Sequence, residues 1–185
     1  MSENSDKYRR AVAGLSAVVN AVPADKWSAP SPCEGWTASH VIGHVISGTQ
    51  MITTVVTGKS PEFGDPAAVA GDDPAAAFAK ARDLALDALT EENLGKPVQS
   101  PMGEMPLDQQ VAMFSTPDVL IHTWDLARAA GVDVRLDPQL VKETYEALLP
   151  IDAMIRMPNV FGPKVEPPAG ADAQTVLICF VGRQP

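Results

Sequence analysis

The chain has 185 residues, of which 45% are hydrophobic and 20% charged, and its formal net charge is −9. That length suffices for one domain with a hydrophobic core, and the composition is that of a globular rather than a disordered protein. The sequence has no cluster of Lys and Arg residues. It therefore lacks the concentrated basic surface that binding to nucleic acid or to an anionic membrane requires. We therefore expect a single domain over residues 1–185, with no nucleic-acid and no membrane partner.

The N-terminal segment and the cysteines favour a cytoplasmic protein. Residues 1–12 lack the apolar stretch of a signal peptide, and no apolar run in the chain approaches the ~18–20 residues of a membrane span. The two cysteines, Cys33 and Cys179, lie far apart and form no C-x-x-C motif. Two such thiols are typical of a reducing compartment, and a disulfide between them is the less favoured alternative.

Helical periodicity dominates the first part of the chain. Apolar residues recur at three- and four-residue spacing over residues 5–20, where Asn4 or Ser5 can cap the helix. The same spacing returns over residues 38–57, where Thr37 is the predicted N-cap and the glycine that follows the segment is the predicted stop. The sequence thus predicts two long amphipathic helices joined by a proline-rich connection.

The middle of the chain predicts a loop, a helix and a hairpin. Residues 59–72 are interpreted as a loop. Asp73-Pro74 supplies an N-cap and a first-turn proline for a third helix, which is expected to end near Gly95. The segment 97–108 alternates in character around a central glycine and predicts a hairpin.

The last part of the chain predicts further helices. A long helix is expected over residues 106–130, with Gly131 as its C-cap and a kink at Pro117. A second Asp-Pro signal predicts a fifth helix over 138–150, and a short final helix is expected within 173–183. The predicted fold is all-α, a four-helix bundle with additional short C-terminal helices.

Ionisable residues gather on two of these predicted helices. His40 and His44 lie one turn apart on one helix, and Asp118 and His122 lie one turn apart on another. Isolated charges in a core cost several kcal/mol unless they are paired or bind a cation. Facing helices can direct His44, Asp118 and His122 to one point, where a divalent metal would satisfy all three. Two histidines and one carboxylate leave coordination positions open, which is typical of a catalytic site.

Two nearby residues can support such a site. Asp125 lies one turn beyond His122 and can accept a hydrogen bond that fixes the tautomer of a ligand histidine. His40 stands at the start of its helix, where it can be exposed, a fourth ligand, or a general base beside the metal. The alternative is that the histidines and carboxylates form an internal polar network without metal, because a D-x-x-x-H pattern alone is weak.

Other side chains receive structural interpretations. Cys33 has no base near it in the sequence and is interpreted as a buried structural thiol. Asp125 and Arg128 can pair with each other across three residues. The three tryptophans, Trp27, Trp36 and Trp124, are interpreted as anchors of the core or of loops.

The chain resembles the DinB-like superfamily, and more closely its actinobacterial branch around the N-terminal domain of mycothiol-dependent maleylpyruvate isomerase. The matching stretches are W-S-A-P-S-P-C-E-G-W at 27–36, His44, D-P-A-A-A-F at 73–78, D-V-L-I-H-T-W-D-L-A-R-A at 118–129, F-G-P at 161–163 and F-V-G-R-Q-P at 180–185. The resemblance implies a four-helix bundle that holds one divalent metal through His44, Asp118 and His122. In relatives the carboxylate of this set can be Glu, so Asp118 is one methylene shorter.

The resemblance also implies a chemistry. Members of this family look like metal-dependent S-transferases or isomerases that combine a low-molecular-weight thiol, such as mycothiol, with a small electrophile. From its donor set, the metal is expected to be Zn²⁺, with Ni²⁺ or Fe²⁺ as alternatives. From their positions in the helices, and not from the resemblance, Asp125 is expected to orient a ligand histidine and His40 to assist proton transfer. The competing interpretations are a non-catalytic bundle that binds metal or a small ligand, and a structural dimer without metal. A homodimer is compatible with each of the three.

Overall fold

The computed structural model describes every residue except 1, 60–63, 101 and 157–159. The chain divides into two units, residues 1–133 and residues 134–185. Helices make up most of the described residues, with one short two-stranded sheet, so the predicted all-α class is confirmed. Within the described part of the chain, none of the helices is long and apolar enough to cross a membrane.

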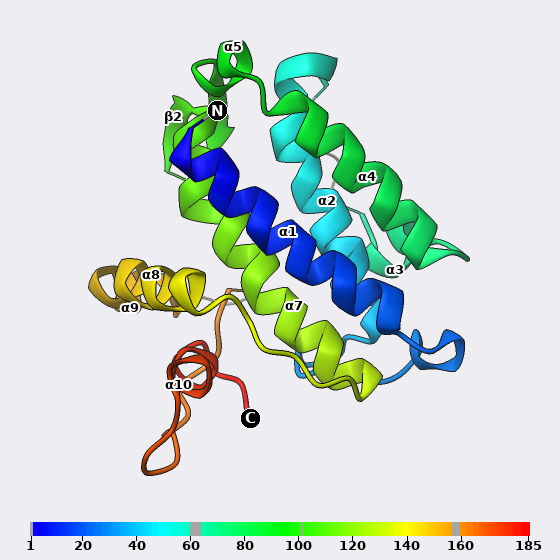
Figure 1. The fold of residues 1–185 in the computed structure, drawn as a ribbon, viewed down its shortest axis with the longest axis vertical. Helices are drawn as coiled ribbons and strands as arrows, with labels where there is room; N and C mark the ends of the chain where they lie inside the picture. The colour runs from blue at the N-terminus through cyan, green and yellow to red at the C-terminus, as the bar shows by residue number, and fades with distance from the viewer. Residues whose placement is uncertain (1, 60–63, 101, 157–159) are drawn as a thin grey trace. The chain divides into compact units, whose positions relative to one another are not determined.

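Four long helices of the first unit form a bundle. They are α1 (Glu3–Ala21), α2 (Ala38–Thr57), α4 (Pro74–Ala88) and α7 (Thr116–Ala130). Helix α1 packs against α7 and α4, and α2 packs against the same two helices, so that the four surround one core (Figure 1). The core contains fully buried side chains from all four, among them Leu15, Ile42, Ile52, Phe78 and Leu126. Burial of each such side chain stabilises the folded state by about 1.5–3 kcal/mol. The helices and their shared core confirm the predicted four-helix bundle.

Helix α2 has the bounds that its sequence predicts. Thr37 is its N-cap, and the side chain of His40 completes a capping box by accepting a hydrogen bond from the Thr37 backbone N–H at 3.2 Å. Gly58 ends the helix in the left-handed conformation, with φ of 65°. A residue with a Cβ is strained there, which is why the glycine is an effective stop.

Helix α1 begins earlier than predicted. Its N-cap is Ser2, whose hydroxyl accepts a hydrogen bond from the backbone N–H of Ser5 at 3.1 Å. The expectation of a cap at Asn4 or Ser5 was wrong because both side chains are used elsewhere. The amide of Asn4 donates to Asp108 at 2.8 Å, and the Ser5 hydroxyl donates to the Ser2 carbonyl at 2.8 Å.

A short helix occupies part of the segment that was expected to be a loop. Helix α3 (Pro66–Ala70) is capped by Asp65, which accepts from the backbone N–H of Ala67 at 3.1 Å, and a proline stands in its first turn. This is the same Asp-Pro signal that starts α4, so the loop prediction overlooked it. Residues 60–63 of the expected loop lie outside the described residues.

The third predicted helix is split in two. Helix α4 ends at Ala88 rather than near Gly95, and α5 (Glu91–Leu94) follows as a separate turn. The split arises because Thr90 acts as a new N-cap, accepting from the backbone N–H of Asn93 at 3.2 Å. The predicted hairpin is present as β1 (Pro97–Ser100) and β2 (Gly103–Pro106), which pair antiparallel.

The fourth predicted helix contains a π-helical turn. Helix α6 (Leu107–Gln110) continues through the π turn η2 (Val111–Ser115) into α7, which ends at Gly131 in the left-handed conformation. In this turn the backbone N–H of Thr116 donates to the carbonyl of Val111, five residues back. Pro117, where the sequence predicts a kink, follows directly and has no N–H to donate. The turn therefore accommodates the proline and precedes Asp118.

The second unit is a small helical cluster. It contains α8 (Pro138–Leu148), the 3₁₀ turn η3 (Leu149–Ile151), α9 (Asp152–Ile155) and α10 (Ala173–Phe180). Helix α8 ends before Pro150, two residues earlier than predicted, and α10 packs against it. The guanidinium of Arg156 donates to the Phe180 carbonyl at 2.6 Å and to the Asp152 carboxylate at 2.8 Å, which ties α9 to the end of α10.

Helix α3 approaches α2 so closely that only glycine fits at position 43. A Cβ at Gly43 would lie 1.8 Å from the carbonyl oxygen of Pro66, whereas a Cβ at Gly14 on the exposed side of α1 would meet nothing within 4 Å. We expect Gly43→Ala to lower the free energy of unfolding by about 2–3 kcal/mol, because backbone must move apart. Gly14→Ala, the matched control, should raise it by about 0.5–1 kcal/mol. Urea unfolding measures both, and equal midpoints for the two variants would contradict this packing.

Candidate metal centre

Three of the residues singled out in the sequence meet between α2 and α7. His44 Nε2 lies 3.1 Å from Asp118 Oδ1, and His122 Nε2 lies 3.4 Å from the same oxygen. One donor atom from each of the three lies within 4.8 Å of the others. The arrangement follows from the spacing, because Asp118 and His122 share one face of α7 and α2 packs against α7.

The geometry of this group fits a divalent cation. Ligand atoms about 2.0–2.1 Å from a tetrahedral Zn²⁺ lie about 3.3–3.4 Å from one another. The two distances to Asp118 Oδ1, 3.1 and 3.4 Å, are close to that value. The side chains of His44 and Asp118 are 36% and 33% exposed, so a further ligand could reach the group from solvent. Gly48 of α2 lies beside the carboxylate of Asp118. A Cβ at this position would lie 3.6 Å from Asp118 Oδ2, so the glycine leaves room there.

Asp118 and His122 shift each other's pKa strongly. Burial alone would raise the pKa of Asp118, but the charge and hydrogen bonds of His122 and His44 outweigh it and hold that pKa far below its usual range. For His122, burial alone would lower the pKa. The charge of Asp118, with hydrogen bonds to Asp118, Asp125 and Cys33, instead raises it well above its usual value. A carboxylate and an imidazolium are thus favoured here when no metal is bound.

Asp125 holds the inner side of His122. Its Oδ2 accepts a hydrogen bond from His122 Nδ1 at 2.9 Å, and its side chain is 0% exposed. This is the contact expected of a residue that orients a ligand histidine through the opposite ring nitrogen. Arg128, the other partner considered for Asp125, places its guanidinium over the Trp124 ring at 5.5 Å.

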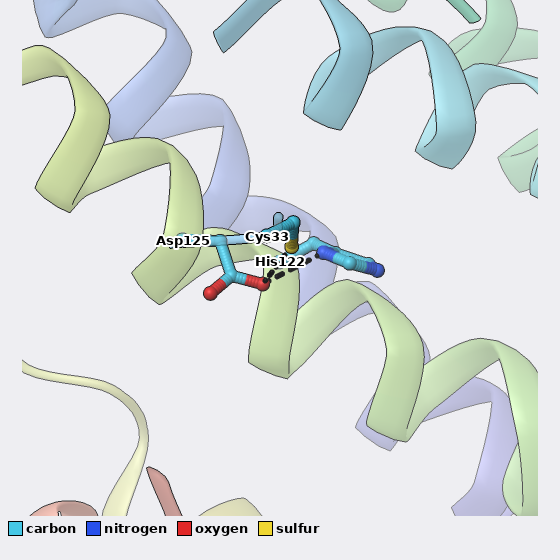
Figure 2. A group of neighbouring side chains, drawn as sticks. All are labelled: Cys33, His122 and Asp125. Carbon is cyan, nitrogen blue, oxygen red and sulfur yellow. Dashed lines mark hydrogen bonds and ion pairs between the residues drawn. The ribbon is translucent and has the colours of Figure 1, made fainter. Parts of the chain in front are cut away.

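Cys33 also reaches this carboxylate, which sequence reasoning missed. Its Sγ donates to Asp125 Oδ2 at 3.3 Å, and Figure 2 shows the thiol and the imidazole converging on that one oxygen. The expectation that Cys33 is buried was wrong, because the residue is only partly buried, and its thiol contacts a buried carboxylate. The two residues are 92 positions apart, so local spacing carried no signal of their contact.

Trp36 covers the two imidazoles. Its ring centroid lies 5.2 Å from that of His44 and 6.1 Å from that of His122, with a stacked geometry on the latter. It stands in the loop from Pro30 to Thr37, whose ends pair through a β-bridge after the 3₁₀ turn η1 (Ala24–Lys26). The tryptophan therefore anchors this loop, as one reading of the sequence expected, and in addition forms an apolar wall of the site.

Tyr8 lies near the candidate centre as well, although the sequence analysis assigned it no part in a site. It is 1% exposed and lies on the inner face of α1. Burial, and next the negative charge of Asp118, raise the pKa of its phenol well above the usual value. Tyr8 is therefore a neutral hydroxyl near the candidate centre, and its only sequence signal was its place in the apolar period of the first helix.

His40 occupies a different position from the three candidate ligands. Its Nδ1 takes part in the capping box with Thr37, and its Nε2 lies 3.8 Å from Asp65 Oδ1. Among the described residues, the two groups able to hold a metal are His44, Asp118 and His122, and Cys33, His122 and Asp125. His40 belongs to neither of them, and its expected part in proton transfer stays a prediction.

Comparisons with known sequences place the chain in a family. Residues 8–127 match the family described as the mycothiol maleylpyruvate isomerase N-terminal domain. The uncharacterized protein Rv0738 of Mycobacterium tuberculosis (strain H37Rv) is 32% identical over 141 residues, which cover 76% of this chain and 74% of that protein. Uncharacterized protein Rv0036c of the same strain is 41% identical over 46 residues, 25% of this chain and 18% of that protein.

Comparisons with solved structures agree on the fold. A mutant of the mycothiol-dependent maleylpyruvate isomerase aligns with a TM-score of 0.61 at 18% identity, over 84% of this chain and 69% of that chain. The isomerase itself aligns with a TM-score of 0.55 at 20% identity, with the same coverage. At these identities the likeness concerns the fold, which is the DinB-like bundle that the resemblance implied. Because the family match spans more than half of the chain, the chain belongs to the mycothiol maleylpyruvate isomerase N-terminal domain family.

Proposed function

We propose that this protein is a metal-dependent enzyme that transfers a low-molecular-weight thiol to a small electrophile, or isomerises such an electrophile through the thiol. The observation that carries the proposal is the group of His44, Asp118 and His122, whose donor atoms lie within 4.8 Å of one another on a partly exposed surface. Two imidazoles and one carboxylate suit Zn²⁺, with Ni²⁺ and Fe²⁺ as alternatives. Mycothiol is the first thiol to consider because the family and the structural neighbours carry its name.

Each residue of the site has a role in this proposal. A bound divalent cation would lower the pKa of an entering thiol, so that the thiolate forms at neutral pH. His44, Asp118 and His122 would hold the cation, and Asp125 would keep the Nε2 lone pair of His122 directed toward it. Trp36 would limit access of water to the reacting atoms, because its indole already covers both imidazoles.

His40 has a proposed part in proton transfer. It lies one turn before His44 on α2, and its side chain is 27% exposed, so it can exchange protons with solvent.

We also propose a cytoplasmic location, since Cys33 and Cys179 form no disulfide in the described structure and low-molecular-weight thiols act in reducing compartments. A homodimer stays a prediction.

Two rival functions remain to be separated from this one. The contacts of Asp118 with His44 and His122 give all three polar groups a partner without metal, which makes a purely structural network the main rival. The other rival is a bundle that binds metal or a small ligand without catalysis. The following measurements distinguish them.

The metal content of the purified protein tests the site directly. We expect about one equivalent of divalent metal per chain in native protein prepared without a chelator or affinity tag, and almost none in Asp118→Ala or His122→Ala. Asp87→Ala, which removes an exposed carboxylate from α4, is the matched control and should retain the metal. Native protein that takes up no Zn²⁺, Ni²⁺ or Fe²⁺ even on reconstitution would favour the structural network.

Proton competition gives the pH dependence of binding. Because the pKa of His122 is raised in the metal-free protein, the imidazole stays protonated above pH 6.5, and a metal must displace that proton. We expect the apparent metal affinity to fall about tenfold for each pH unit below that raised pKa, in proportion to one released proton. Calorimetric titrations in buffers with different ionisation enthalpies give the number of protons released for each metal ion bound. Binding at neutral pH without proton release would argue against His122 as a ligand.

Thiol transfer separates the enzyme from a binding bundle. With the metal bound, we expect the native protein to accelerate conjugation of mycothiol to a chromogenic electrophile, and glutathione or cysteine to react more slowly. The rate should fall to the uncatalysed value in Asp118→Ala, because the thiolate is no longer stabilised. Full metal occupancy with no acceleration for any thiol and electrophile tested would favour the non-catalytic rival.

A further inference from the structure

We infer that Cys33 is a positioning residue of the centre: its thiol holds the Asp125 carboxylate, and through it the His122 ring, in the orientation that presents Nε2 to Asp118 and His44. The inference rests on the proposed function, because it takes His122 as a metal ligand. It assigns to Cys33 a part in metal binding that does not require the sulfur to touch the metal.

Cys33 contacts the carboxylate that holds the ring of His122. Asp125 Oδ2 accepts from His122 Nδ1 at 2.9 Å and from Cys33 Sγ at 3.3 Å, so both donors act on one oxygen (Figure 2). Because the Asp125 side chain is 0% exposed, bulk water cannot replace a donor that is removed. A second donor on this oxygen therefore restricts how the carboxylate can rotate, and with it how the imidazole can tilt.

The loop that carries Cys33 holds the thiol in place. The Cys33 backbone N–H donates to the Ser31 hydroxyl at 3.2 Å, and the Cys33 carbonyl accepts from the Trp36 backbone N–H at 3.0 Å. The ends of the loop are joined by the bridge between Pro30 and Thr37. The closed loop thus fixes the backbone of Cys33, and the hydrogen bond to Asp125 holds Sγ itself. The same loop places Trp36 over the two imidazoles.

Positioning explains this arrangement better than direct ligation by Cys33. The donor atoms of Cys33, His122 and Asp125 also lie within 4.8 Å of one another, so the group could in principle hold a metal. A cation there would require the sulfur and His122 Nδ1 to give up the two protons that now satisfy Asp125 Oδ2. The carboxylate of that group, Asp125, is 0% exposed, whereas Asp118 on the other side of His122 is 33% exposed.

Fluorescence of the protein itself can measure the effect. Trp36 lies 5.2 and 6.1 Å from the two imidazoles, so Co²⁺ or Ni²⁺ bound between them should quench its emission. Trp36→Phe removes this reporter and identifies its share of the signal. Titrations with Co²⁺ then give the metal affinity of the native protein, Cys33→Ala and Cys33→Ser, with Cys179→Ala as the control for loss of a thiol that is 0% exposed.

We expect Cys33→Ala to weaken Co²⁺ binding about tenfold, the lower end of the effect of losing a residue that orients a metal ligand. Cys33→Ser should restore most of the affinity because its hydroxyl can donate to Asp125, and Cys179→Ala should bind as the native protein does. Native affinity in Cys33→Ala would overturn the inference while leaving the proposed function intact. A thiolate-to-Co²⁺ charge-transfer band that disappears in Cys33→Ser would also overturn it, by making Cys33 a ligand.

A readout that needs no metal separates the two hypotheses further. The His122 Nδ1 proton, hydrogen-bonded to a buried carboxylate, should exchange slowly with solvent and be visible by proton NMR in metal-free protein. Faster exchange in Cys33→Ala, with slow exchange restored in Cys33→Ser, would support positioning even if the native protein bound no metal. Equal exchange in all three proteins would contradict it.

Discussion

The contact between one carboxylate and two imidazoles is the constraint on which the candidate site depends. Asp118 Oδ1 lies 3.1 Å from His44 Nε2 and 3.4 Å from His122 Nε2, and these contacts give each polar group a partner in a partly buried place. The contact requires α2 and α7 to pack at this level. Two local features serve that packing: Gly43, where α3 closes over α2, and the π turn that accommodates Pro117 just before Asp118. The fold and the candidate site are therefore parts of one arrangement of helices.

The two ring nitrogens of His122 face different environments, and this asymmetry organises the site. Nε2 faces Asp118, whose side chain is one third exposed, whereas Nδ1 faces Asp125, which is completely buried. A buried acceptor fixes the ring and its tautomer, and an exposed neighbour leaves room for a cation and a further ligand. The loop from Pro30 to Thr37 acts on both sides, because Cys33 contacts Asp125 and Trp36 covers the imidazoles.

Family membership and site chemistry support different statements. The family match over residues 8–127 and the likeness to the isomerase structures establish which bundle this is. Solved structures at 18–20% identity say nothing by themselves about substrate, because one fold carries many activities. The proposed thiol chemistry depends instead on the donor atoms brought together here, and on what enters the open side of His44 and Asp118.

Sequence alone determined those features that depend on local spacing. The apolar period located the long helices, Thr37 and Gly58 bounded α2 correctly, and the one-turn spacing of Asp118 and His122 identified their shared face. Helical spacing also identified His44, one turn after His40 on α2, and Asp125, one turn after His122 on α7. Only the tertiary structure decided the contacts that join distant segments: Cys33 to Asp125 across 92 residues, and Trp36 over the imidazoles. Local periodicity says which way a side chain faces along its own helix, but what it meets there is set by how helices and loops pack.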